Sequence, residues 1–147
     1  MLAYPAKTYR LLAVDDEEDV LELYHTILAP QPLSPAHHLF AVEEDSDPNN
    51  TLQAYFDKET NFSFDRASQG EEAVEAVRQA TALSAPYAVA FIDIRMPPGI
   101  DGLQTATQIR EIDPNIQIFI ITAFSDYSVE QIQHQLSHHV VVLNKPF

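Results

Sequence analysis

Short apolar runs rich in Val, Ile and Phe alternate along this chain with segments of helical periodicity. The runs cover residues 9–14, 61–67, 87–94, 116–122 and 140–143. Their length is typical of strands, and an uninterrupted apolar run is typical of a strand covered on both faces. Helical spacing follows the first run at Val20, Leu23, Tyr24 and Ile27, and similar stripes follow the next three runs. The alternation predicts an α/β fold with a doubly wound, five-stranded parallel sheet.

Two of the predicted helices carry capping patterns at their starts. Ser68 and Glu71 have the S-x-x-E form of a capping box. Ser125 or Ser128 is expected to cap the helix that begins near Val129.

The pattern is interrupted between the first helix and the second strand. Residues 30–60 contain four prolines and an acidic patch, where two to six connecting residues are usual. We expect an insertion with a role in partner binding or dimerisation. Because it joins a helix end to a strand start, it should lie at the edge of the sheet opposite the carboxyl ends of the strands, where the candidate site described below is expected. The chain ends directly after the fifth strand, where a doubly wound sheet normally places another helix. We therefore expect 1–147 to be one domain without a fifth helix, at the N-terminal end of a longer protein.

The charge balance restricts the classes of partner. The chain carries 22 Asp and Glu against 8 Lys and Arg, a formal net charge of −14. Nucleic-acid binding requires a basic surface, so it is disfavoured, whereas spare carboxylates can hold a divalent cation. The chain has no cysteine, which excludes disulfides and thiolate metal sites. It has no signal-peptide pattern and no apolar run of about 18 residues, so we expect a cytoplasmic domain without membrane contact.

Polar residues end or follow four of the predicted strands, namely Asp15 and Asp16, Asp93, Thr122 and Lys145. Ligands of open parallel sheets bind beyond these strand ends. Three carboxylates at one edge repel each other, and Mg²⁺ or Mn²⁺ would relieve that repulsion. The ammonium of Lys145 can hold a phosphate oxygen. These residue types favour phosphoryl transfer onto a carboxylate, with Asp93 at the central strand as the nucleophile.

With these residues the chain resembles the receiver domains of two-component response regulators. That family has an acidic pair after the first strand, a phosphoacceptor aspartate after the third, Thr or Ser after the fourth and Lys-Pro after the fifth. The matching segments here are LAVDDE, FIDIRMP, IITA and NKPF, in that order. The resemblance implies a flavodoxin-like fold with strand order 2-1-3-4-5.

The resemblance also implies a role for each residue. Asp93 would accept a phosphoryl group from a histidine kinase or phosphotransfer protein. Asp16, Asp93 and the backbone carbonyl of Arg95 would ligate Mg²⁺, with Asp15 acting through water. Thr122 and Lys145 would bind the phosphoryl oxygens, and movement of Thr122 would switch an output module outside this chain. The chain would be a signalling phosphoacceptor rather than an enzyme, and a homodimer is left open.

The sequence departs from the family pattern near the site. The loop 96–102, MPPGIDG, is one residue longer than usual and resembles that of receivers attached to kinase or cyclic-dinucleotide modules. Val142 stands where the family often has an aromatic rotamer switch. Arg95 and Phe124 flank the site and are expected to tune the phosphoryl lifetime. Phe124 and Tyr127 are interpreted equally well as a partner surface or as ordinary packing.

Two rival functions fit the same fold. A phosphorylation-independent pseudo-receiver would act only as an interaction module, and the complete residue set argues against it. A metal-dependent phosphatase would need an acid or base such as Asp two residues after Asp93, where this chain has Arg95.

Overall fold

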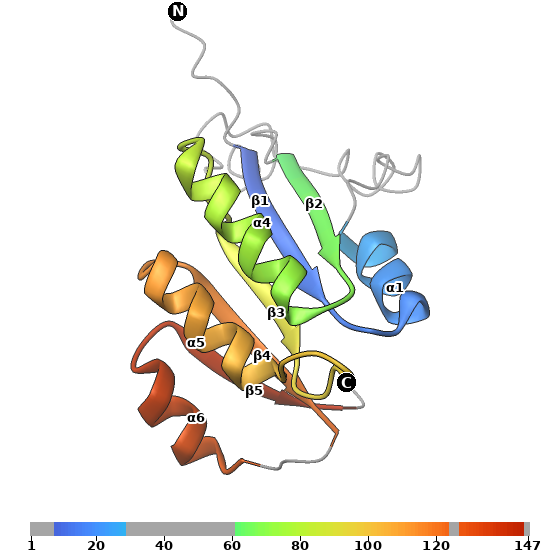
Figure 1. Ribbon diagram of the computed structural model, residues 1–147. Coiled ribbons are helices and arrows are strands. Elements are labelled where there is room, and N and C mark those ends of the chain that lie inside the picture. The colour runs from blue at the N-terminus through green and yellow to red at the C-terminus, as the bar shows by residue number, and fades with distance from the viewer. Residues whose placement is uncertain (1–7, 29–60, 124–126, 146–147) are drawn as a thin grey trace, which may run out of the picture.

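A computed structural model describes residues 8–28, 61–123 and 127–145 of the chain. Strands and helices alternate along these residues (Figure 1). The strands are β1 (Thr8–Val14), β2 (Asn61–Ala67), β3 (Val89–Asp93), β4 (Gln117–Thr122) and β5 (Val140–Asn144). The helices are α1 (Glu18–Leu28), α4 (Gly70–Ala82), α5 (Gly102–Ile112) and α6 (Val129–Leu136). The five predicted strands are thus confirmed, whereas the predicted insertion at 30–60 lies outside the described residues.

The five strands form one sheet in the order β2-β1-β3-β4-β5, and every neighbouring pair is parallel. This confirms the predicted order and fold class. Asp93 pairs with Ile121, and Thr122 pairs with Asn144, so β3, β4 and β5 end at the same edge. The register therefore places the residues that follow these strands close together.

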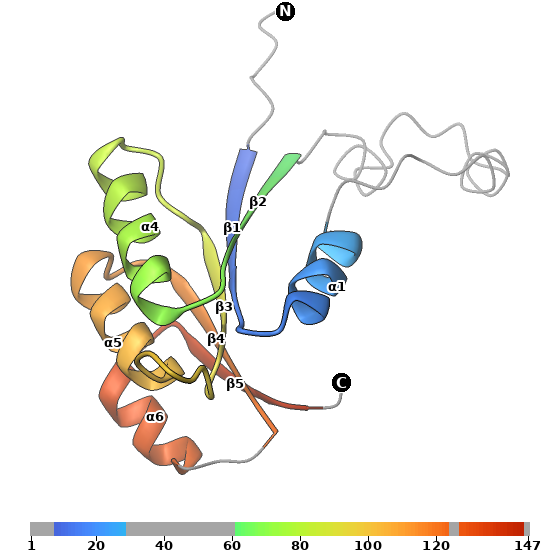
Figure 2. The same cartoon turned by 45° about the vertical axis from the view of Figure 1, so that its right-hand side comes forward.

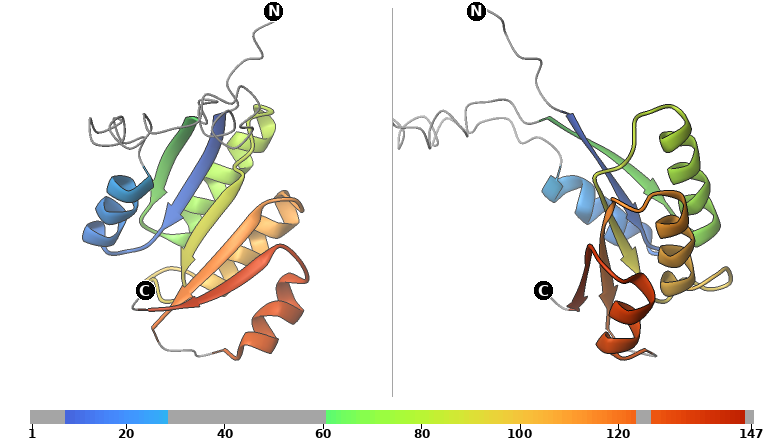
Figure 3. Two further views of the ribbon diagram at one scale, coloured as in Figure 1. Left: turned by 180° about the vertical axis from the view of Figure 1, so that it is seen from behind. Right: turned by 90° about the vertical axis from the view of Figure 1, so that its left-hand side faces the viewer.

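Helices lie on both faces of the sheet. Figure 2 shows α4, α5 and α6 on one face and α1 on the other, and Figure 3 shows the same layers from behind and from the side. The core between the sheet and α4–α6 contains fully buried aliphatic side chains, among them Leu12, Ala90, Ile118, Val77 and Ile109. Burial of each large side chain of this kind stabilises the fold by roughly 1.5–3 kcal/mol.

The α1 face of the sheet carries an aromatic row. The ring of Phe91 stacks between those of Tyr24, 5.4 Å away, and Phe119, 5.2 Å away. Leu23 and Ile27 of α1 are 56% and 62% exposed on the flank of this helix. No helix within the described ranges is long and apolar enough to span a membrane.

The capping box predicted at Ser68 is wrong. The N-cap of α4 is Gln69, whose side chain makes no capping hydrogen bond. Ser68 instead donates from its backbone N–H and its hydroxyl to Glu72, both at 3.1 Å. The carboxylate of Glu71 instead accepts a hydrogen bond from the backbone N–H of Ile100, in the loop after β3. Glu71 therefore does not form the reciprocal hydrogen bond of a capping box.

The starts of α5 and α6 are both closed by capping boxes. Ser128 accepts from the backbone of Gln131, which confirms one of the two predicted caps, and Ser125 lies outside the described residues. At α5 the cap is Asp101, which accepts from the backbone of Gln104 at 2.8 Å. This second box has a readable D-x-x-Q signature that the sequence analysis did not use.

Candidate functional site

Asp15 follows β1 and is 1% exposed. One carboxylate oxygen accepts a hydrogen bond from the backbone N–H of Glu17 at 2.9 Å, which fixes its orientation. Burial raises the pKa of Asp15, and the nearby Asp93 carboxylate adds to this shift. The carboxylate oxygens of Asp15, Asp16 and Glu17 lie within 4.8 Å of one another. The β1–α1 turn therefore concentrates negative charge at this edge.

Asp93 is the last residue of β3 and is 9% exposed. One of its carboxylate oxygens lies 3.1 Å from the ammonium nitrogen of Lys145. Burial raises the pKa of Asp93, although Lys145 and the backbone N–H of Arg95 oppose the shift by stabilising the ionised form. The carboxylate is thus largely removed from solvent and oriented by these two partners.

Lys145 connects the two buried aspartates. Its ammonium nitrogen also lies 3.5 Å from a carboxylate oxygen of Asp15. Burial disfavours the ammonium, but the two carboxylates outweigh that effect and raise the pKa of Lys145. Its backbone N–H donates to the carbonyl of Thr122 at 2.8 Å, which anchors the start of the segment after β5 to the end of β4.

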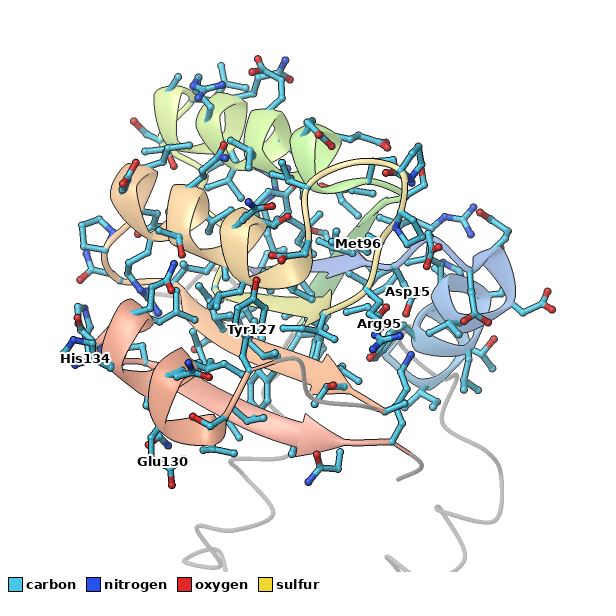
Figure 4. All side chains as sticks on the ribbon, turned by 60° about the horizontal axis from the view of Figure 1, so that its bottom comes forward. Asp15, Arg95, Met96, Tyr127, Glu130 and His134 are labelled. Atoms are coloured by element: carbon cyan, nitrogen blue, oxygen red, sulfur yellow. The ribbon has the colours of Figure 1, made fainter. Side chains whose placement is uncertain are left out.

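A pocket of about 260 Å³ opens at this edge of the sheet. It is lined by Asp16, Glu17, Asp93, Ile94, Arg95, Pro97, Ala123 and Lys145. Thr122 is 2% exposed and immediately precedes Ala123 of the lining. Figure 4 looks onto this edge, with Asp15 and Arg95 labelled. The structure therefore brings all the predicted site residues to one edge, from the ends of four strands.

Glu17 is a pocket residue that the sequence analysis did not select. Its carboxylate belongs to the same group as those of Asp15 and Asp16, and its backbone orients Asp15. The signal was present in the run of acidic residues from Asp15 to Asp19, of which only the first two were selected as site residues.

The loop after Asp93 docks onto the start of α4. Gln69 accepts from the backbone N–H of Gly99 at 3.3 Å, and Glu71 accepts from that of Ile100 at 3.1 Å. Met96 is 1% exposed and anchors the loop in the core. This loop thus spans from the site to the start of α4.

The donor set of this edge fits a hard divalent cation. It offers carboxylate oxygens on the buried side chains of Asp15 and Asp93, whose ionisation is disfavoured first by burial and then by neighbouring carboxylates. Mg²⁺ is commonly bound by one or two carboxylates with waters completing an octahedron. The open pocket leaves room for such waters and for a phosphoryl group.

Comparison with known proteins identifies the family of this chain. A family model described as "Response regulator receiver domain" matches residues 39–147, well over half of the chain. This chain belongs to that family. The match begins after β1 and α1, so the acidic pair of this receiver domain precedes the matched range, and the structure brings it to the same edge as Asp93.

Solved structures share the fold of the receiver domain. A CheY-like receiver domain protein from Methanospirillum hungatei JF-1 has 15% sequence identity and a TM-score of 0.60, covering 96% of this chain and 84% of that one. The response regulator protein TrrA from Thermotoga maritima, solved in complex with Mg(2+)-BeF, has 26% identity and a TM-score of 0.57, covering 95% and 88%.

A curated relative is much longer than this receiver domain. It is the cyclic di-GMP phosphodiesterase of Thermotoga maritima, 30% identical over 88 residues. The match covers 60% of this chain and 22% of that protein, so this chain corresponds to about a fifth of its length.

Proposed function

We propose that this receiver domain accepts a phosphoryl group on Asp93 from a phosphohistidine, in a Mg²⁺-dependent reaction. The donor would be a histidine kinase or a phosphotransfer protein. The observation that carries the proposal is the contact between Lys145 and Asp93, at 3.1 Å, beside a pocket lined by further carboxylates.

Asp16, Asp93, the backbone carbonyl of Arg95 and, through water, Asp15 are the groups that would hold the metal ion. When bound, Mg²⁺ would neutralise charge on the phosphoryl oxygens. Glu17 adds a further carboxylate to this set, within 4.8 Å of those of Asp15 and Asp16.

Residues of the chain would perform the remaining steps. A carboxylate oxygen of Asp93 attacks phosphorus, a P–O bond forms, and the P–N bond to the donor imidazole breaks with its electron pair staying on nitrogen. Lys145 holds one phosphoryl oxygen as a point charge, and the hydroxyl of Thr122 donates to another. The chemistry would be limited to the phosphorylation and dephosphorylation of this chain itself.

The phosphorylated state would control an output module or partner outside this chain. The much longer curated relative, a cyclic di-GMP phosphodiesterase, supports this because the receiver-like part is a minor fraction of its length. Movement of Thr122 toward the phosphoryl group would carry the signal to α6.

Incubation with acetyl phosphate and Mg²⁺ tests the proposal. We expect a mass gain of one phosphoryl group that is stable in acid and labile in base, is abolished by EDTA and is absent in Asp93→Asn. The matched control is Asp113→Asn, because Asp113 is also buried but follows α5 at the opposite edge of the sheet. A wild-type protein that gains no phosphoryl group with any donor would contradict the proposal and favour the pseudo-receiver.

A further inference from the structure

The loop between β3 and α5 contributes part of the wall of the functional pocket. Arg95 and Pro97 line the pocket, and Met96 between them is buried in the core. The loop is closed at its base, because the N–H of Gly102 donates to the carbonyl of Ile94 at 2.9 Å. Figure 4 shows this loop, with Met96 labelled, arching from the site toward the first turn of α4. The position of the loop therefore affects the shape of the pocket.

Two side chains at the start of α4 hold the tip of this loop. The tip has the sequence PPGI, and proline has no backbone N–H, so the tip has only two backbone donors. The N–H of Gly99 donates to Gln69 at 3.3 Å, and that of Ile100 donates to Glu71 at 3.1 Å. The side-chain amide of Gln69 also donates to the carbonyl of Pro97 at 3.5 Å. Both backbone donors of the tip are thus bound to the start of α4, and a third bond reaches a residue of the pocket wall.

The tip and the start of α4 are in direct contact. A Cβ atom on Gly99 would lie 2.5 Å from a carboxylate oxygen of Glu71 and 2.9 Å from the amide oxygen of Gln69. A Cβ atom on Gly70 would lie 2.6 Å from the side chain of Ile100. The absence of a side chain at both glycines permits this close approach.

Gln69 and Glu71 bind the loop rather than the helix to which they belong. Gln69 is the N-cap of α4 but makes no capping hydrogen bond, and Glu71 does not close a capping box. Side chains at a helix start usually stabilise the helix by accepting from its unpaired N–H groups. Here the acceptors are bound to the loop instead. Replacing either side chain should therefore disturb the loop more than the helix.

The path from these bonds to the metal side of the pocket is short. Only Met96 separates Arg95 from Pro97, and its side chain is 1% exposed and held in the core. The carbonyl of Arg95 and the N–H of Met96 belong to one planar peptide group. A tip released from α4 would move Pro97 while the Met96 side chain stays in place. The backbone around Met96 would then have to rotate, and the Arg95 carbonyl would rotate with it.

We propose that Gln69 and Glu71 are positioning residues: by holding the loop tip against α4, they orient the backbone carbonyl of Arg95 and so strengthen Mg²⁺ binding. The inference rests on the proposed function, in which that carbonyl ligates the ion. Partners that orient a metal ligand without touching the ion commonly change metal affinity by about 10- to 100-fold. Because the nucleophile belongs to β3 and not to the loop, its attack on phosphorus should change little once the ion is bound.

Isothermal titration calorimetry with Mg²⁺ tests this role without a phosphodonor. Gln69→Ala and Glu71→Ala each remove bonds to the tip. We expect each variant to bind Mg²⁺ about tenfold more weakly than the wild type, the lower end of the usual range. Glu71→Gln removes the charge but keeps an oxygen that can accept from the N–H of Ile100. Its Mg²⁺ affinity should stay close to that of the wild type.

A matched control and a kinetic readout separate positioning from charge and from folding. Glu72→Ala removes another carboxylate from the first turn of α4, one that accepts from Ser68, and should leave the Mg²⁺ affinity unchanged. Labelling of Gln69→Ala by acetyl phosphate should be slow at low Mg²⁺ concentration and should approach the wild-type rate at saturating Mg²⁺. Urea denaturation of each variant shows that the folded fraction is the same under the assay conditions.

The outcomes are distinct for the two proposals. Equal Mg²⁺ affinity of Gln69→Ala and the wild type overturns the positioning role and leaves the proposed function intact. Equal weakening by Glu71→Gln and Glu71→Ala also overturns it, because the charge and not the hydrogen bond would then account for the effect. A wild type that binds Mg²⁺ but is labelled by no donor overturns the proposed phosphorylation alone. A wild type that binds no Mg²⁺ overturns both proposals.

Discussion

The ammonium nitrogen of Lys145 lies 3.1 Å from a carboxylate oxygen of Asp93, although the two residues belong to the ends of different strands. Lys145 follows β5, and Asp93 ends β3, with β4 between them in the sheet. The contact is possible because β3, β4 and β5 are parallel and end at the same edge of the sheet. The same register leaves the carboxylate of Asp15 within 3.5 Å of the same ammonium.

Replacement of Lys145 by Met removes the charge and keeps most of the apolar stem. We expect Lys145→Met to slow labelling of Asp93 by acetyl phosphate by about a hundredfold, the usual cost of losing one oxyanion-stabilising donor. Arg78→Gln is the control, since it removes an exposed cation that pairs with Glu75 on α4. An unchanged initial rate in Lys145→Met would show that its ammonium does not act on the phosphoryl group.

Asp15→Asn should stabilise the metal-free protein at neutral pH. Burial raises the folded-state pKa of Asp15 above 3.8, the value for a solvated carboxyl. The group therefore contributes stability below about pH 4, and this contribution is lost as the pH rises through the folded pKa. Asn does not ionise, so the variant does not lose stability as the pH rises, and its side-chain oxygen can still accept the hydrogen bond from the N–H of Glu17.

The measurement is the free energy of unfolding in urea, from pH 4 to pH 8, with EDTA. The advantage of Asp15→Asn over the wild type should grow as the pH rises and then level off. Mg²⁺ in place of EDTA should reduce this advantage, because an ion that binds only the folded wild type stabilises it. A constant difference between the two proteins across this range would contradict the prediction.

Gly102→Ala should disrupt the loop after β3. A Cβ atom there would collide with the backbone of Asp93 and Ile94, neither of which can move without shifting β3. We expect a loss of about 2 kcal/mol in the free energy of unfolding, typical of overpacking, together with slower labelling. At Gly99 a Cβ atom would meet only the flexible ends of Glu71 and Gln69, so Gly99→Ala should be tolerated much better. Equal stability of the two variants in urea would count against the close contact.

Tyr87→Phe should destabilise the opposite edge of the sheet without affecting phosphorylation. The hydroxyl of Tyr87 donates to Asp65 at 2.6 Å, and the guanidinium of Arg10 lies over its ring. We expect a loss of about 1 kcal/mol at pH 7, the typical net value of a hydrogen bond.

The pH dependence of this loss has a definite sign. Burial, with the nearby Asp65, raises the pKa of Tyr87 from 10.0 to about 12. The advantage of the wild type over Tyr87→Phe is therefore complete below pH 10 and is lost as the pH rises toward 12. Unfolding free energies at pH 7, 9, 10 and 11 test this, and a difference that is constant up to pH 11 would be inconsistent with it.

Local patterns in the sequence determined the elements and the residues that end them. Continuous apolar runs predicted the strands because both faces of a parallel sheet are buried, and helical spacing predicted the helices between them. Asp93, Thr122 and Lys145 could be selected because the carboxyl ends of parallel strands share an edge. The family resemblance rested on those same positions and needed no contact information.

Contacts between segments distant in the sequence were decided only by the tertiary structure. Glu71 was expected to close a capping box with Ser68, but the loop after β3 takes its carboxylate. The hydroxyl of Tyr127 donates to Asp101, a partner that no local pattern in the sequence indicated. A local sequence pattern shows which hydrogen-bonding groups a side chain has. Its partner depends on which distant segment the packing of the sheet and helices brings within hydrogen-bonding distance.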